Sequence, residues 1–210
     1  MSYVLYERPG WGSAMIEAQL VLYAIPHTRV AVAHLYSDAA ARAEFAKINP
    51  AGQIPALILP DGSLMTESAA ITLHLADVSG SDALVPGPRA PERPAFLRWL
   101  VFLVAQVYAP FVIGDRPGKF VPGGDAAKAL ADNVRILRED MWRIVEANAG
   151  APWFLDERFS ALDIFVATMT HWTPRRPWFA ANTPKLAQIA ARADALPALA
   201  VVWKRNFPDG

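Results

Sequence analysis

The stretch NPAGQIPALILPDGSLMTES, residues 49–68, holds an ordered set of features that suits the binding of a small ligand. Pro55 opens an apolar run, where its peptide bond is either a trans link at a strand start or a cis link that redirects the main chain. An Asp-Gly turn follows, and Glu67 and Ser68 then begin a predicted helix. These two are either ordinary helix-start residues or a site for a ligand's carboxylate and ammonium, because free N–H groups and the helix dipole favour an anion there. Together, the features indicate a backbone shaped to hold a small peptide.

The residue types that are missing exclude several kinds of chemistry. The chain of 210 residues contains no cysteine, which excludes disulfides, cysteine-ligated zinc, a thiol nucleophile of the protein's own and a thioredoxin-type redox centre. No metal is expected, because no metal-ligand spacing relates the histidines, which are His27, His34, His74 and His171. The 20 basic and 20 acidic side chains give a net charge of zero, so no nucleic-acid partner is expected.

The apolar content favours a packed globular protein. Apolar residues make up 53% of the chain. The most apolar window, Trp99–Ile113, is shorter than the ~20 residues of a membrane span and contains a glutamine and a proline, so it predicts a buried helix and no membrane partner. The first ten residues, MSYVLYERPG, do not have the pattern of a secretory signal, and the cytoplasm is the expected compartment.

The first half of the chain alternates strands and helices in the order βαβαββα. Strands are predicted at 3–6, 28–35, 54–59 and 63–65, and helices at 13–25, 38–47 and 67–78. Ser13 and Asp38 are the predicted caps of the first two helices. The first two strands are joined through a helix and should be parallel, whereas the last two form an antiparallel hairpin.

The second half is predicted to be helical throughout. It follows a linker in the proline-rich stretch Ser79–Pro94. Helices are predicted at 94–113, 125–149, 160–172, 184–195 and 197–205. Pro110 should bend the first of them. Ser160 and Asp163 have the spacing of a capping box, with Ser160 at the N-cap.

Three segments resemble the cytosolic glutathione transferase family of bacterial type. They are NPAGQIPAL with DGSLMTESAAITLHLAD, FSALDIF, and LYERPGWGS, and the resemblance covers about residues 3–206. It implies an α/β plus all-α fold, with a thioredoxin-like βαβαββα domain at 1–80, a linker at 81–92 and a helical-bundle domain at 93–210.

The resemblance also implies a glutathione-binding site in the first domain. Pro55 matches a cis-proline of the family, which turns the main chain of Ile54 outward so that it pairs with the cysteinyl unit of glutathione like a short added strand. Glu67 and Ser68 match the pair that holds the γ-glutamyl end, and Gln53 adds a side-chain contact. Lys47 either reaches the glycyl carboxylate or is a solvated lysine at a helix end.

The family stabilises the thiolate of glutathione with a donor near the end of the first strand or the start of the first helix. The serine-using classes have their serine near the position of Gly10, and the bacterial class that uses cysteine has it at the position of Gly12. The catalytic candidates here are Ser13 and Tyr6, and the main-chain amides of Trp11 or Gly12 are a further alternative. Ser13 can also be a plain cap, and Tyr6 a core aromatic residue.

A second substrate would bind beside aromatic residues of both halves. The candidates are Trp11, Tyr108, Phe111 and Trp172. The segment His171–Phe179, HWTPRRPWF, either closes this pocket with its arginines or is an ordinary interhelical loop.

The resemblance therefore implies a cytoplasmic, homodimeric glutathione transferase that adds glutathione to a small, electrophilic, apolar compound. Glutathione is its cosubstrate. Isomerase, dehalogenase and peroxidase variants use the same thiolate and stay open. The alternative is a non-catalytic binding or scaffold protein on the same fold, which the missing thiolate donor favours.

Overall fold

The computed structural model describes residues 2–208, and the contacts within it divide the chain into two units. The first unit contains the residues up to Arg89 together with those from Arg192 onward, and the second contains Ala90–Ala191. The residues from Arg192 onward thus pack with the first half of the chain. The predicted division, with a linker at 81–92, assigned these residues to the helical domain instead. Each unit is described by itself below.

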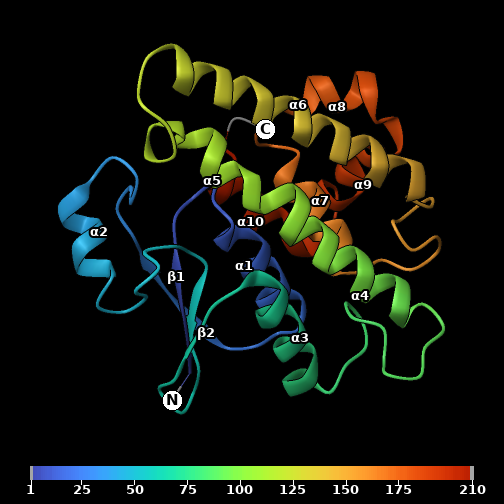
Figure 1. Cartoon of the computed structure of the whole chain (residues 1–210). Coiled ribbons are helices and arrows are strands. Elements are labelled where there is room, and N and C mark those ends of the chain that lie inside the picture. The colour runs from blue at the N-terminus through green and yellow to red at the C-terminus, as the bar shows by residue number, and fades with distance from the viewer. Residues whose placement is uncertain (1, 209–210) are drawn as a thin grey trace. The chain divides into compact units, whose positions relative to one another are not determined.

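The first unit has the predicted βαβαββα order and then takes up the end of the chain. Its elements are β1 (Tyr3–Glu7), α1 (Ser13–Leu22), β2 (His27–Ala31), α2 (Ala39–Phe45), β3 (Ala56–Ile58), β4 (Leu64–Met65), α3 (Ser68–Ser79), a 3-10 turn (Pro197–Leu199) and α10 (Ala200–Asn206). The sheet order is β2-β1-β3-β4 (Figure 1). β1 and β2 are parallel, and β3 is antiparallel to both β1 and β4, as the connections predict.

The two faces of the sheet are covered by different parts of this unit. Alternate residues of β1 are buried, and α1 packs against β1, α3 and α10. Residues of the opposite parity, such as Tyr6, pack instead into a cluster built on Leu35, Phe45 and Ile54. The period of two along β1 therefore places Tyr6 beside the loop that precedes β3, which is the loop predicted to bind a ligand.

The second unit is mainly helical. Its elements are α4 (Arg93–Phe102), a π-helical stretch (Leu103–Tyr108), α5 (Ala109–Asp115), a 3-10 turn (Pro117–Lys119), α6 (Asp125–Asn148), α7 (Ala161–Met169), α8 (Arg176–Asn182) and the greater part of α9 (Pro184–Asp194). The segment His171–Phe179 was predicted to close a pocket or to be an interhelical loop. The structure corrects this prediction, because the end of the segment belongs to helix α8. A proline in the first turn of a helix needs no N–H partner, so Pro177 starts α8 instead of preventing it.

Pro110 acts on the helix before it. Proline has no N–H to donate to the carbonyl four residues earlier, which interrupts the α-helical hydrogen-bond pattern. The stretch Leu103–Tyr108, just before Pro110, has the wider π-helical geometry. The continuous helical stretch Arg93–Asp115 has 23 residues and is long and apolar enough, by length and composition, to cross a membrane. This corrects the view that the apolar window is too short for a span. The core helix of a soluble protein passes the same test, so the stretch is weak evidence for a membrane.

The predicted capping box is confirmed at the start of α7. Ser160 accepts from the Leu162 N–H through its hydroxyl, and the Asp163 carboxylate accepts from the Ser160 N–H at 2.7 Å. A further bond to Asp163 comes from the Phe154 N–H at 2.7 Å. Burial raises the pKa of Asp163 to about 6, although the hydrogen bonds from Phe154 and Ser160 lower it.

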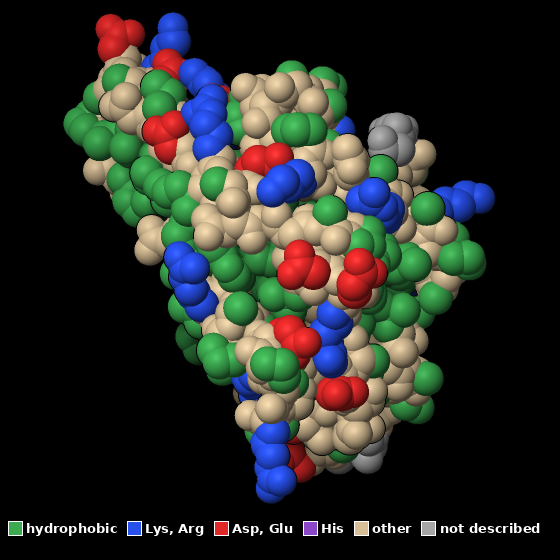
Figure 2. Space-filling view, turned by 90° about the vertical axis from the view of Figure 1, so that its right-hand side faces the viewer, with side chains coloured by type: hydrophobic (Ala, Val, Ile, Leu, Met, Phe, Trp, Pro, Cys, Tyr) green, Lys and Arg blue, Asp and Glu red, His purple; other side chains and the backbone are tan. Residues whose placement is uncertain are grey.

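The surface carries both signs of charge. On the face drawn in Figure 2, acidic and basic side chains are interspersed among hydrophobic ones. On this face the two signs are mixed, in agreement with the net charge of zero.

Candidate functional site

The loop before β3 is shaped by a buried asparagine. Asn49 donates from Nδ2 to the carbonyl of Gln53 at 2.7 Å and accepts at Oδ1 from the Ala51 N–H at 3.1 Å. Its own carbonyl accepts from the N–H of Gly52, which has a φ of +60°. Asn49 therefore holds the main chain up to Gln53 in one shape. This role of Asn49 was not predicted from the sequence, although an asparagine before a short glycine-containing loop is a signal of such bridging.

The next residues present an unpaired main chain. The Ile54–Pro55 peptide bond is cis, as predicted. The Ile54 side chain is buried beside Phe45, whereas no residue between 2 and 208 forms a hydrogen bond with the Ile54 N–H or carbonyl. These two groups point to a ligand with a main chain of its own, because buried main-chain groups are normally paired.

The β3–β4 hairpin connects this loop to the start of α3. β3 begins directly after Pro55, and its Leu57 pairs with Met65 of β4, three residues before Ser68. Ser68 is the first residue of α3 and is buried, and its hydroxyl has no hydrogen-bond partner among the described residues. Residues 54–68 thus contain an unpaired main chain, a free hydroxyl and a helix N-terminus.

Glu67 has a strained main chain. Its φ is +64° and its ψ is +108°, a region that residues with a side chain rarely adopt. Strain of this kind costs about 1–3 kcal/mol and is concentrated at functional sites. We refer to Gln53, Ile54, Pro55, Glu67 and Ser68 as the cradle.

The loop between β1 and α1 holds the Ser13 hydroxyl in place. Ser13 Oγ donates to the Arg8 carbonyl at 3.2 Å and accepts from the Arg8 N–H at 3.1 Å. Gly12 is the N-cap of α1, and the helix has no side-chain cap, so the prediction that Ser13 caps it is wrong. The Ser13 side chain therefore stabilises the preceding loop and does not cap the following helix.

The other donor candidates differ in how free they are. The Trp11 N–H donates to the Arg8 carbonyl at 3.1 Å and is therefore occupied. The Gly12 N–H and the Tyr6 hydroxyl have no recorded hydrogen bond to the described residues. The Tyr6 ring packs edge-on against Phe45 with centroids 5.5 Å apart, in the cluster that includes Ile54. Tyr6 thus lies beside the cradle.

The predicted second-substrate residues belong to two clusters. In the second unit, the Trp172 ring lies 5.1 Å from both Tyr108 and Phe111, centroid to centroid. Trp11 belongs to the first unit, where its ring packs against His34 at 5.2 Å and Tyr36 at 4.7 Å. Three of the four predicted residues therefore form one aromatic surface.

The charged residues near these clusters are engaged. Arg176 donates to the Ala167 carbonyl at 3.1 Å and contacts His171 Nε2 at 2.8 Å, so this arginine is tied inside the second unit. Burial, and secondarily Arg176, lowers the pKa of His171 to about 4. Lys47 is exposed and paired with Glu44. Within residues 2–208 no group of three or more metal-ligating His, Asp or Glu side chains occurs.

Comparisons with known proteins agree on one family. The family model for the glutathione S-transferase N-terminal domain matches residues 16–78. An uncharacterised GST-like protein of Escherichia coli K12, YncG, is 36% identical over 203 residues, which cover 96% of this chain and 97% of YncG.

Two solved structures have the same architecture. A glutathione transferase homologue from Sulfitobacter with bound glutathione aligns with a TM-score of 0.84 at 22% identity, over 96% of each chain. A sphingomonad glutathione S-transferase complexed with glutathione aligns with a TM-score of 0.73 at 27% identity, over 96% of this chain and 97% of that one.

Proposed function

The chain belongs to the glutathione transferase family, and from this premise we propose that it binds glutathione in the cradle, stabilises its thiolate and adds it to a small, electrophilic, apolar compound. The observation that carries the proposal is the main chain at the cradle. The Ile54 N–H and carbonyl have no hydrogen bond to the described residues, and the hairpin that follows leads to the start of α3, where Glu67 has a strained φ of +64°. A solved relative at 27% identity is complexed with glutathione.

Each part of glutathione has a complementary group in the cradle. The cysteinyl unit pairs with the Ile54 main chain as an added strand. The γ-glutamyl carboxylate accepts from the Ser68 hydroxyl and from the amides at the start of α3, and its ammonium donates to Glu67. Gln53 contacts the peptide from the loop that Asn49 holds.

The thiolate needs a donor that is free. A thiol with an ordinary pKa of about 8.5 is mostly neutral at pH 7, and lowering that pKa by ~2 units takes ~2.7 kcal/mol. The Tyr6 hydroxyl and the Gly12 N–H are the best candidates for the group that donates to the thiolate, because neither forms a hydrogen bond with the described residues. Ser13, the other candidate, must give up its bond to the Arg8 carbonyl before it can donate to sulfur.

The electrophile is proposed to bind at the aromatic cluster formed by Tyr108, Phe111 and Trp172, whose ring centroids lie 5.1–6.5 Å apart. Phe111 is buried, with the Arg138 guanidinium over its ring, so the partly exposed rings of Tyr108 and Trp172 are proposed to contact the apolar compound. Conjugation, isomerisation, dehalogenation and peroxide reduction all start from the same thiolate.

We further propose a cytoplasmic homodimer. Large apolar side chains stay exposed on two helices of the second unit, at Val101 on α4 and at Leu137 and Ile144 on α6. Leu137 and Ile144 are seven residues apart and share a helix face, which a second copy of the chain would cover. Light scattering on the purified protein measures the mass, and a monomer at micromolar concentration would contradict the dimer.

A non-catalytic glutathione-binding protein on the same fold is the second candidate. It is favoured by one observation, the engagement of the Ser13 hydroxyl with the Arg8 main chain. Titration calorimetry with glutathione, combined with the ultraviolet absorbance of the bound thiolate, separates the two candidates. Binding with a thiolate at neutral pH supports the enzyme, and binding without one supports the second candidate. No heat at millimolar glutathione would contradict both.

The variant Ser68→Ala tests the site itself. It removes a hydrogen bond to a charged group and should weaken glutathione binding by about 1–3 kcal/mol. Ser79→Ala is the matched control, because Ser79 ends the same helix and donates to the Ala76 carbonyl away from the cradle. Equal affinities in the two variants would show that the cradle is misplaced.

A further inference from the structure

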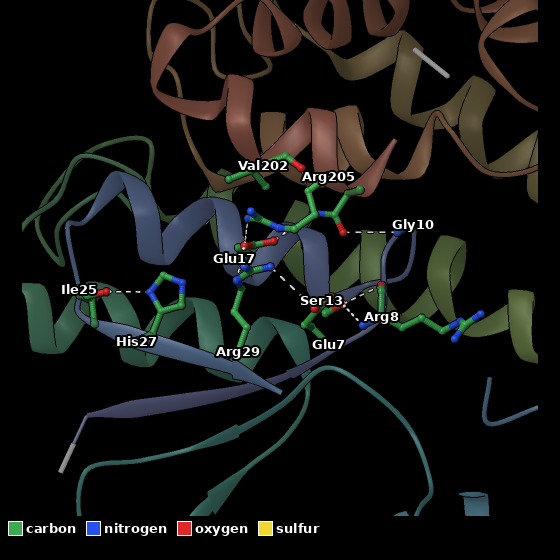
Figure 3. A network of polar contacts seen from close by, with 11 residues as sticks. Glu7, Arg8, Gly10, Ser13, Glu17, Ile25, His27, Arg29, Val202 and Arg205 are labelled. Carbon is green, nitrogen blue, oxygen red and sulfur yellow. Dashed lines mark hydrogen bonds and ion pairs between the residues drawn. The ribbon is translucent and has the colours of Figure 1, made fainter. Parts of the chain in front are cut away.

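The last residue of α10 connects three distant parts of the first unit. Asn206 is buried and donates from Nδ2 to Glu17 Oε2 and to the Val202 carbonyl, both at 3.0 Å. Its Oδ1 accepts from the Gly10 N–H at 3.3 Å. The end of α10, the middle of α1 and the β1–α1 loop are thereby joined through one side chain, in the network drawn in Figure 3.

The orientation of this side chain is fixed by charge. Glu17 is buried and accepts from Arg205 at Oε1, with Arg29 Nε 3.4 Å from the same oxygen. Because the Glu17 carboxylate can only accept, it selects the NH₂ end of the Asn206 amide, and the amide oxygen must then face Gly10. The two arginines thus determine which end of Asn206 meets the loop.

The loop also rests on the end of α10 at Gly10. Gly10 has a φ of +79°, and a Cβ built there would lie 3.5 Å from the Asn206 carbonyl oxygen and 4.0 Å from the Phe207 ring. The left-handed φ turns the chain after β1, and the turn lies directly against this segment. Two residues later comes Gly12, whose N–H is one of the free donors.

From these contacts we infer that Asn206 is a positioning residue for thiolate formation: it holds Gly10, and through Gly10 it sets the place of the Gly12 amide and of Ser13 relative to the sulfur of glutathione. This inference rests on the proposed function. Asn206 does not touch glutathione in this scheme; it acts through the loop. The cradle that binds the peptide lies on other segments and does not depend on it.

The chain offers a close control for this role. Asn182 ends α8, as Asn206 ends α10, and it also donates from Nδ2 to the carbonyl four residues earlier, that of Trp178. It is exposed and belongs to the second unit. Asn182→Ala therefore removes the same local bond without touching the β1–α1 loop.

The test compares Asn206→Ala with Asn182→Ala by titrating the thiolate absorbance of bound glutathione against pH. In Asn206→Ala the thiol pKa should rise by about half a unit to one unit, with the glutathione Kd changed less than about twofold. In Asn182→Ala both quantities should stay at the wild-type values. A folded Asn206→Ala protein with the wild-type thiol pKa would overturn the inference while leaving the proposed function intact.

Amide hydrogen exchange provides a second measurement that needs no thiolate and no variant. In the unaltered protein, the Gly10 N–H should exchange at least about tenfold more slowly than a free loop amide, because it donates to a buried acceptor. Exchange at the free rate would overturn the inference even if Asn206→Ala does not fold. If the wild-type protein does not bind glutathione, the proposed function fails, and the inference fails with it.

Discussion

The hydroxyl of Ser13 and the main chain of Arg8 exchange two hydrogen bonds, at 3.2 Å from Oγ to the carbonyl and at 3.1 Å from the N–H to Oγ. The single hydroxyl proton of Ser13 is thus used within the loop. Ser13 was predicted to cap the first helix or to donate to sulfur, and in the structure its hydroxyl closes the turn after β1 instead.

We predict that Ser13→Ala lowers the free energy of unfolding by about 1 kcal/mol, because the half-buried Arg8 N–H loses its partner while the Arg8 carbonyl keeps the bond from the Trp11 N–H. Tyr6→Phe should instead raise the pKa of the bound thiol by about 1–2 units, the effect of one hydrogen bond to a charged sulfur. Denaturant unfolding measures the first quantity and thiolate absorbance the second. The opposite pattern, a larger pKa rise in Ser13→Ala, would assign the donor role to Ser13.

Glu67→Gly should separate stability from binding. Glycine adopts a φ of +64° without strain, so the variant should gain about 1 kcal/mol of unfolding free energy, while losing the carboxylate that accepts the glutathione ammonium and binding about tenfold more weakly. Thermal unfolding and calorimetry are the two measurements.

Ala24→Gly is the matched control for this prediction. Ala24 is exposed and has a φ of +52° outside the cradle, so its replacement should also stabilise the fold but leave glutathione affinity unchanged. If Glu67→Gly keeps wild-type affinity, the strained main chain has no connection with the ligand.

Stability should depend on pH through Asp163. The pKa of this carboxyl is raised to about 6 in the folded protein, above its ordinary value near 3.8. The folded state therefore holds the proton more tightly, and the contribution of Asp163 to stability is complete below pH ~4 and is lost as the pH rises through about 6. The unfolding free energy of the wild type relative to Asp163→Asn should increase by up to about 3 kcal/mol between pH 7 and pH 4.

The comparison with the variant is needed because His171 acts in the opposite direction. Its pKa is lowered to about 4, so its contribution is present above pH ~6.5 and is lost as the pH falls through about 4. A wild-type-minus-variant difference that is flat from pH 7 to pH 4 would contradict the raised pKa of Asp163.

Tyr108→Ala tests the aromatic surface of the second unit. Tyr108 packs against Trp172 with centroids 5.1 Å apart, and the loss of one aromatic contact should raise KM for an activated aryl halide about threefold to tenfold. KM for glutathione should not change. A larger effect on glutathione than on the aryl halide would remove this surface from the electrophile site.

The order of elements in the first unit could be predicted because each one carries a local signal. Alternating apolar residues indicate β1, and Asp38 caps α2 by accepting from the Ala41 N–H; in the second unit, the Ser160–Asp163 pair likewise begins α7. Local signals failed where a residue had two possible partners. Ser13 was predicted to cap the first helix, but it is the first residue of that helix, and its hydroxyl bonds to the Arg8 main chain.

Contacts between distant residues could not be predicted from the sequence. Nothing near Asn206 in the chain indicates that it accepts from Gly10, and nothing near Glu17 indicates that Arg205 pairs with it. Such bonds depend on how α10 packs on α1, which follows from the whole apolar pattern and not from a motif. The cis bond before Pro55 could be predicted because a family resemblance supplied what the local pattern left open, whereas the role of the cradle residues in binding stays a prediction.

The π-helical stretch Leu103–Tyr108 has a consequence for how relatives of this chain can diversify. Successive side chains of an α-helix are about 100° apart around the helix axis. A π-helical turn contains more residues, so the side chains after it point in a different direction from the one that continuous α-helical winding would give. Removing one residue from this stretch would restore ordinary winding and rotate Tyr108 and Phe111 away from Trp172. A change in length alone, with every aromatic residue retained, would then reshape the aromatic cluster that we propose as the electrophile site.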